Sequence, residues 1–293
     1  MLGGAAPAKG VAVVGLLAGA LSACTHPSNV DLYVTPAPSP VQVTITTIPA
    51  VRDDGTVPRN ARFVVQLDGY PDPDSVGFGP ITLRSGRANF DIRTDIDLVG
   101  RSVLVTPRSL LIPGAQYDVL VSGLATLDDR VQSEDAIGSF RAGLDEGDPV
   151  PPRPRPTWTA DVRPVLATCA PFCHSPVGAS GRTRTPTRLL DLTLLDPTDR
   201  QLGLVNVLSI GLRGTDAVLA RVAPRDPARS VLLRKLLGGS PTADSLDPPY
   251  PNTRVDGRRM PIPLDESQPA TETLSDPDLV MIQDWIFAGA PTD

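Results

Sequence analysis

The residues with the clearest chemical potential are two cysteines and a histidine in the stretch Cys169-Ala170-Pro171-Phe172-Cys173-His174. Two cysteines followed directly by a histidine form the arrangement that attaches a c-type haem. Each thiol adds to one vinyl group of the porphyrin, and the imidazole that follows becomes an axial ligand of the iron. The usual motif has two residues between the cysteines and this chain has three, so the motif needs support from the rest of the sequence.

Three other chemistries use the same residue types. Cys169 and Cys173 would form a small disulfide in an oxidising compartment, which leaves His174 as an ordinary surface residue. A zinc site would need a further ligand, and the only other histidine, His26, lies close to the N-terminus. A thiol oxidoreductase would prefer C-x-x-C beside a βαβ unit, which the sequence does not predict.

The length and composition bound the possible partners and fold classes. A chain of 293 residues is long enough for about two domains. The 33 prolines and an aromatic content of 4% indicate much loop, linker and strand-and-turn structure. The net charge is −6 and no long basic run occurs, which argues against a nucleic-acid partner, since phosphate binding needs clustered Lys and Arg.

Residues 1–24 have the features of an export signal. Lys9 precedes an apolar run from Val11 to Ala20 that is too short to span a bilayer as a mature helix, and the stretch ends at Leu21-Ser22-Ala23-Cys24. This ending resembles the bacterial lipoprotein signal, and the resemblance implies that Cys24 becomes a lipid-bearing N-terminus that anchors the protein to a membrane without spanning it. The alternative is an ordinary secretory signal with an incidental cysteine, and both interpretations predict export.

Residues 41–143 alternate between apolar and polar side chains with the period of a β-strand. A tether over residues 25–40, with the proline-rich stretch from Thr35 to Pro40, precedes them. Turn signals such as Asp53-Asp54-Gly55 and Pro113-Gly114 separate runs that we predict as strands, and this spacing predicts an antiparallel sandwich. The runs place one set of residues on one face: Val41, Val43 and Ile45; Phe63, Val65 and Leu67; Val103 and Val105; Tyr117, Val119 and Val121.

This segment resembles the bacterial Ig-like domain of surface-layer and other exported proteins. The resemblance implies a spacer or adhesion module, and it is carried by Asp53 to Gly55, Arg62 to Leu67, Asp72 to Val76, Leu110 to Val119 and Phe140. A proline-rich linker over residues 144–157 follows, with five prolines between Gly147 and Pro156, and it is expected to be semi-rigid.

Residues 158–293 are predicted to be mainly helical. Helical signals occur over Ala160 to Ala167, over Ala228 to Leu237, and after Ser275, an expected N-cap with Asp278 three residues later. Leu204 to Leu212 is an apolar segment interpreted as a helix, and Ala217 to Val222 is interpreted as a strand. The predicted fold class is therefore multidomain: an all-β Ig-like sandwich followed by a mainly α, cytochrome c-like domain.

The ordered set of motifs in this half resembles the c-type cytochrome domains of planctomycetes and myxobacteria. It consists of Asp161 to Leu166, Cys169 to His174, Ser230 to Leu236, Arg259-Met260-Pro261, and Leu274 to Asp276 leading to Trp285 through Pro291. The resemblance implies thioether bonds from Cys169 and Cys173 to one covalent haem c, with His174 as proximal ligand and Met260 as distal ligand.

The residues agree on Met260, because Met1 is removed with the signal and Met281 lies inside the predicted terminal helix. Two protein ligands on the iron predict a one-electron carrier that serves an unidentified redox partner protein, and no enzyme. Peroxidase-like activity is expected only if Met260 does not bind the iron. The expected location is the cell envelope, with the protein lipid-anchored on the periplasmic or outer-membrane side.

Overall fold

The structure of the chain is a computed structural model that describes residues 39–167, 192, 194, 196–209, 219–237 and 274–293. The chain divides into two compact units, Met1–Ala37 and Pro38–Asp293, and all described residues belong to the second. Within these ranges, no helix has the length and apolar character needed to cross a bilayer.

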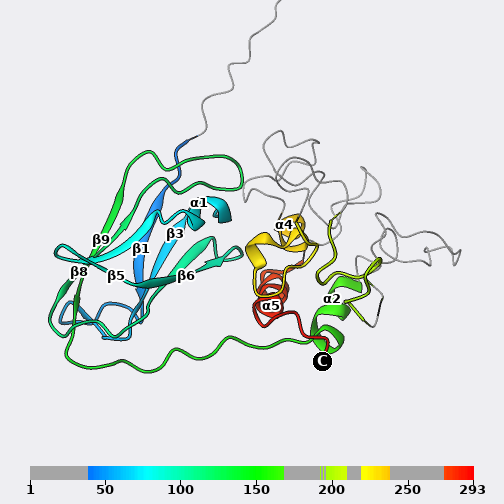
Figure 1. The fold of residues 1–293 in the computed structure, drawn as a ribbon. Helices are drawn as coiled ribbons and strands as arrows, with labels where there is room; N and C mark the ends of the chain where they lie inside the picture. The colour runs from blue at the N-terminus through cyan, green and yellow to red at the C-terminus, as the bar shows by residue number, and fades with distance from the viewer. Residues whose placement is uncertain (1–38, 168–191, 193, 195, 210–218, 238–273) are drawn as a thin grey trace, which may run out of the picture. The chain divides into compact units, whose positions relative to one another are not determined.

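The first sheet has four antiparallel strands in the order β1-β3-β7-β6 (Figure 1). Its register places Phe63 opposite Val105 and Val65 opposite Val103, so the apolar residues of β3 and β7 lie on the same face. The strands are β1 (Val43–Ile48), β3 (Arg62–Leu67), β6 (Ile92–Asp97) and β7 (Ser102–Pro107).

The second sheet has five strands in the order β2-β9-β8-β4-β5, and β2 is the strand that runs parallel to its neighbour. The short turn Ser85-Gly86-Arg87 joins β4 to β5, and Gly86 adopts a positive φ of 59°, a backbone conformation that glycine tolerates without steric cost. The strands are β2 (Thr56–Val57), β4 (Ile81–Ser85), β5 (Ala88–Phe90), β8 (Gln116–Val121) and β9 (Ala136–Ala142).

The two sheets pack face to face through the residues that alternate inward along their strands. Phe63 of the first sheet and Phe140 of the second have ring centroids 5.2 Å apart. Tyr117 is fully buried, and its hydroxyl accepts a hydrogen bond of 2.8 Å from the backbone N–H of Ile112. The period-two runs predicted around Phe63, Val103 and Tyr117 are therefore strands with one buried face.

One helix of this region was not predicted. Helix α1 (Pro73–Gly77) lies between β3 and β4, and the Asp72 side chain caps it by accepting from the backbone N–H of Asp74 at 3.1 Å. Proline at the first helical position supports the start, since its missing N–H has no partner in the first turn of a helix. Val76 fixes the helix to the sandwich core.

The predicted fold class, an Ig-like sandwich followed by a mainly α, cytochrome c-like domain, is wrong. The described part of the chain is mostly β sheet, and between residues 158 and 293 its helices are short: a π-helical turn η1 (Trp158–Val162), α2 (Arg163–Ala167), a 3-10 turn η4 (Pro227–Arg229), α4 (Val231–Leu237) and α5 (Asp276–Phe287).

Local backbone features explain why helices do not fill the described part of this half. Leu204 begins a segment interpreted as a helix from sequence, but Val205 and Leu208 instead form isolated bridges with Val222 and Ala220. Asn206 has a φ of 58°, which lies in the left-handed region and interrupts a right-handed helix. The helix expected over Ala160 to Ala167 starts as a π-helical turn that Thr157 caps.

The terminal helix α5 has the cap that the sequence predicts. The Ser275 side chain accepts from the backbone N–H of Asp278 at 3.3 Å, and the Asp278 carboxylate accepts from the Ser275 backbone N–H at 3.3 Å. We expect Ser275→Ala to lower the free energy of unfolding by about 1 kcal/mol, because an N-cap side chain satisfies a backbone donor of the first turn. Urea unfolding followed by circular dichroism measures this, and an unchanged midpoint would contradict the cap's role.

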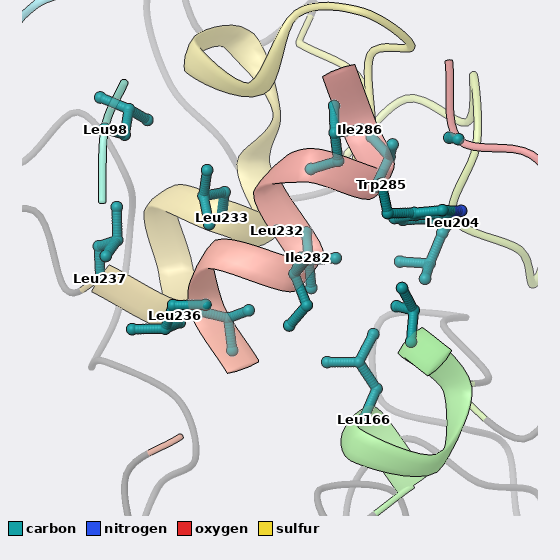
Figure 2. Close-up of a cluster of buried hydrophobic side chains, with 14 of the residues drawn as sticks. Leu98, Leu166, Leu204, Leu232, Leu233, Leu236, Leu237, Ile282, Trp285 and Ile286 are labelled. Atoms are coloured by element: carbon teal, nitrogen blue, oxygen red, sulfur yellow. The ribbon is translucent and has the colours of Figure 1, made fainter. Parts of the chain in front are cut away.

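Loops of the sandwich join the hydrophobic core of the C-terminal half. Leu98, which follows β6, and Tyr70 and Leu127 belong to the same cluster as the leucines of α4, and Figure 2 shows Leu98 beside Leu237. The buried side chain of Gln283 on α5 accepts from the Val99 backbone N–H at 3.2 Å and donates to Asp97 at 2.8 Å. The sandwich and the helices are therefore connected by both apolar and polar contacts.

Candidate functional site

The sequence-predicted site residues lie outside the described ranges. Cys169, Cys173 and His174 fall within residues 168–191, Met260 falls within residues 238–273, and the predicted lipidation site Cys24 falls within residues 1–38. Their roles stay predictions. The structure describes the elements that lead into the first two of these segments, and these elements form the candidate site.

One hydrophobic cluster borders both segments that hold the predicted haem ligands. Leu166 at the end of α2 and Leu192 flank the segment that contains the C-x₃-C-H motif, and both are buried in the cluster. Leu237 at the end of α4 and Leu279 on α5 flank the segment that contains Met260, and both belong to the same cluster. Elements adjacent to both ligand segments are thus packed together (Figure 2).

The cluster contains the only two tryptophans of the chain, Trp158 and Trp285. Both are fully buried, and their ring centroids are 5.6 Å apart with an interplanar angle of 33°. Sequence reasoning placed Trp285 beside the apolar stripe of the last helix but did not single out Trp158. The available signal was that Trp158 is one of only two tryptophans and lies at the start of the expected Ala160–Ala167 helix region.

Hydrogen bonds fix the orientation of both indole rings. The Trp158 Nε1–H donates to the carbonyl oxygen of Leu194 at 3.0 Å, and the Trp285 Nε1–H donates to the carbonyl oxygen of Pro291 at 2.9 Å. The Pro291 carbonyl also accepts from the Trp158 backbone N–H at 3.1 Å. A buried indole N–H that has a hydrogen-bond partner avoids a desolvation penalty, so these bonds hold both rings in a fixed orientation next to α2.

Arginine side chains are buried in the same half. Arg221 donates to the carbonyl oxygen of Gly203 at 2.6 Å, and burial lowers the pKa of its guanidinium. Arg234 on α4 is 3% exposed, and its Nε–H donates to the carbonyl oxygen of Ala228 at 2.8 Å. These contacts to backbone carbonyls stabilise the loops around the cluster.

The proline-rich linker is attached to α5 through Arg153. The Arg153 guanidinium lies 3.2 Å from a carboxylate oxygen of Asp284, which is 5% exposed, and 4.2 Å from the centroid of the Phe287 ring. An ion pair and a cation–π contact on one side chain therefore fix the path of the linker into η1.

The loop that contains the buried Leu204 is stabilised by the ionised carboxylate of Asp199. The backbone N–H groups of Leu202 and Gln201 donate to Asp199 at 2.7 and 2.9 Å, and these bonds lower the pKa of its carboxyl. A carboxyl whose pKa is lower in the folded state contributes stability above its unfolded pKa and loses it as the pH falls through the folded pKa.

We therefore expect Asp199→Ala to reduce stability at pH 7, and the difference from the wild-type protein to shrink as the pH falls from ~4 towards ~2. Urea unfolding at both ends of this range measures the effect. A difference that is constant or that grows in acid would contradict it.

In the ranges that the structure covers, no group of three or more His, Cys, Asp or Glu side chains is placed to hold a metal ion.

No protein-family model matches the chain, and no curated protein matches it. Three solved structures of bacterial surface-layer proteins are similar to parts of it. The N-terminal part of the S-layer protein SbsC has a TM-score of 0.29 and 16% identity, and the match covers 39% of this chain and 25% of that chain. Domains 1–6 of the surface-layer protein SbsC have a TM-score of 0.29 and 14% identity, with 52% of this chain and 20% of that chain covered. The S-layer protein rSbsC(31–844) has a TM-score of 0.27 and 12% identity, with 51% of this chain and 19% of that chain covered.

The chain thus spans a quarter or less of the length of each of these proteins. Likeness at this level of superposition assigns neither a family nor a function.

Proposed function

We propose that the chain is an exported, membrane-anchored electron carrier that holds one covalent haem through Cys169 and Cys173. The observation that carries the proposal is the C-x₃-C-H motif, which starts two residues after the last residue of α2. The carrier function is proposed for a β-rich chain in which short helices flank the motif, in place of the mainly α domain expected from the sequence.

The motif has the donor set that the cofactor requires. Two thiols and an adjacent imidazole would hold the haem covalently and bind its iron, and Met260 would supply a thioether sulfur as a second iron ligand. When bound, haem c would supply one-electron chemistry. With His174 and Met260 on the iron, no coordination position stays open for a substrate, which favours a carrier over an enzyme.

The described residues next to the motif fit a large apolar group. Val165 on α2 and Leu274 before α5 are partly buried hydrophobic residues that pack against the cluster, and they border the two ligand segments. Apolar side chains at these two positions would extend the cluster towards a porphyrin. Helix α2 would position Cys169, because a single residue, Thr168, separates the helix from the first thiol.

Cys24 would carry the lipid that attaches the protein to a membrane, so the haem would be presented in the cell envelope. This compartment agrees with the thioether chemistry, because c-type haem attachment takes place outside the cytoplasm in the proteins that the sequence resembles. The partner would be another redox protein, and the net charge of −6 argues against nucleic acid.

The tryptophan pair provides a test that does not depend on colour alone. Because both tryptophans of the chain lie in the cluster next to α2, we expect a haem bound at Cys169 to quench their fluorescence. The emission of haem-loaded full-length protein should be several-fold weaker than that of the same chain produced without haem maturation. Equal emission from two folded samples would contradict a haem at this place.

The axial ligands are tested separately in haem-loaded protein. Met260→Ala should abolish the iron–thioether charge-transfer band and open a coordination position, while Met281→Ala on α5 is the matched control and should leave the band unchanged. Persistence of the band in Met260→Ala would show that another residue is the distal ligand.

A second function is favoured by one observation. The tryptophan pair and its leucines are fully or nearly fully buried, and protein side chains alone complete this core. The alternative is a haem-free structural or binding lipoprotein of the envelope with a Cys169–Cys173 disulfide. A colourless protein in which Cys169 and Cys173 become reactive thiols only after reduction would establish this alternative.

A further inference from the structure

A recess of about 400 Å³ lies on the sandwich, where β3 begins and β7 ends. Its wall on the other side is formed by Pro149 and Val150 of the proline-rich linker. The linker is fixed there by Asn60, whose side-chain amide donates to the Gly147 carbonyl and whose oxygen accepts from the Gly147 N–H, both at 2.9 Å. The recess is therefore built from two segments that hydrogen bonds hold together.

The recess is positively charged. Its described lining includes three arginines, Arg59, Arg62 and Arg108, and no acidic residue. The Arg59 Nε–H donates to the carbonyl oxygen of Leu111 at 2.9 Å, which fixes the plane of its guanidinium. Planar guanidinium groups match the geometry of carboxylate and phosphate oxygens, so three arginines that line one recess favour an oxyanion there.

Within the part of the chain that the structure covers, one carboxylate pairs with these arginines, and it competes only weakly with a bound anion. Asp91 lies 3.4 Å from the Arg108 Nε, and the two side chains are 80% and 61% exposed. An ion pair this open to water contributes little, so a bound anion displaces it at small cost.

A buried hydroxyl lies in the same recess. Thr106 Oγ1 is inaccessible to solvent and has no hydrogen-bond partner among the described residues. Because Phe63 pairs with Val105, Thr106 on β7 lies beside Arg62 on β3, and both side chains face away from the sandwich core. Because its Oγ1 is inaccessible to solvent, Thr106 forms part of the wall of the recess and does not itself contact a bound anion.

We propose that this recess binds an oxyanion, either the carboxylate or phosphate group of an anionic polymer or a free phosphate ion. Arg62 and Arg108 supply charge-assisted hydrogen bonds, and Arg59, held by its bond to the Leu111 carbonyl, adds positive charge. The site lies on the sandwich and does not depend on haem, so its test is independent of the electron-carrier proposal.

The test uses the full-length chain in detergent. Equilibrium dialysis measures binding of radiolabelled inorganic phosphate, and isothermal titration calorimetry measures binding of polygalacturonate, a carboxylate polymer. Binding of the polymer but not of phosphate identifies a polymer site, and binding of phosphate identifies a site for the free ion. Absence of binding in both measurements would overturn the proposal.

Variants separate the recess from general charge attraction. Arg62→Gln with Arg108→Gln should weaken binding by at least about tenfold, because two charge-assisted bonds are lost while Arg59 keeps its structural contact. Thr106→Val, which keeps the charge and shape, should leave binding unchanged, because the Thr106 hydroxyl is inaccessible to solvent. Arg87→Gln, an exposed arginine in the β4–β5 turn, is the control and should bind as the wild-type protein does. Equal binding by the double variant and Arg87→Gln would also overturn the proposal.

Discussion

Replacing both Cys169 and Cys173 with serine is expected to remove covalent haem from the protein completely. Each thiol is expected to form one thioether bond, and serine cannot replace it. Full-length chains expressed in a host that matures c-type cytochromes should show haem staining after denaturing electrophoresis for the wild-type protein and none for the double variant. The tryptophan emission of the double variant should rise at the same time.

The third cysteine of the chain is the matched control. Cys24→Ser is expected to leave the haem stain unchanged while it abolishes incorporation of labelled fatty acid, because Cys24 lies in the lipoprotein-like signal and outside the haem motif. A double variant at Cys169 and Cys173 that keeps its haem stain would contradict the assignment of these thiols. Loss of the stain in Cys24→Ser would show that cysteine replacement acts through export.

Trp285→Ala should have the largest effect on stability. Trp285 is fully buried, packs on Trp158 with ring centroids 5.6 Å apart, and donates to the Pro291 carbonyl at 2.9 Å. Truncation of such a side chain leaves a cavity and removes the indole hydrogen bond, so we expect a loss of about 3–5 kcal/mol in the free energy of unfolding. Most domains have a total stability of about 5–15 kcal/mol, so this loss would leave the C-terminal half marginally folded.

Urea unfolding followed by circular dichroism measures this change. Val280→Ala is the control on the same helix, because Val280 is 42% exposed and its truncation should cost less than about 1 kcal/mol. The two variants should therefore differ clearly in their midpoints. Equal midpoints would show that the tryptophan pair is not the centre of this core.

The two-residue alternation of apolar side chains and the helix-capping motif predicted those parts of the fold that depend on local sequence. Phe63 and Val65 alternate with outward-facing residues, and a one-residue shift would expose the whole set, so the pattern determines the buried face of β3. The capping box at Ser275 and Asp278 was equally local, because both hydrogen bonds lie within one turn of α5.

The parts that could not be predicted depend on long-range packing. Leu204 to Leu212 is a short apolar run, and such a run is compatible with a helix or an extended segment until its partners are known. The partner of Val205 is Val222, and the partner of Gln283 is the loop after β6, contacts that no sequence window contains. The mainly α expectation for residues 158–293 failed for this reason.

The candidate site divides in the same way. The C-x₃-C-H motif is local in sequence and could be found directly, whereas the contact of Trp158 with Trp285 joins the two ends of the C-terminal half. The arginine recess also combines segments that are distant in sequence, since Arg62 lies on β3 and Val150 lies in the linker that follows the sandwich. Sequence patterns identify reactive residues, and the structure is needed to identify the surfaces around them.

The pyridine haemochrome spectrum of the purified full-length chain tests the central claim most directly. We expect one haem per chain that acid-acetone does not extract, with the spectrum of a porphyrin whose two vinyl groups are both saturated by thioether bonds. A protein that is colourless, or that releases all of its haem into acid-acetone, would contradict covalent attachment through Cys169 and Cys173.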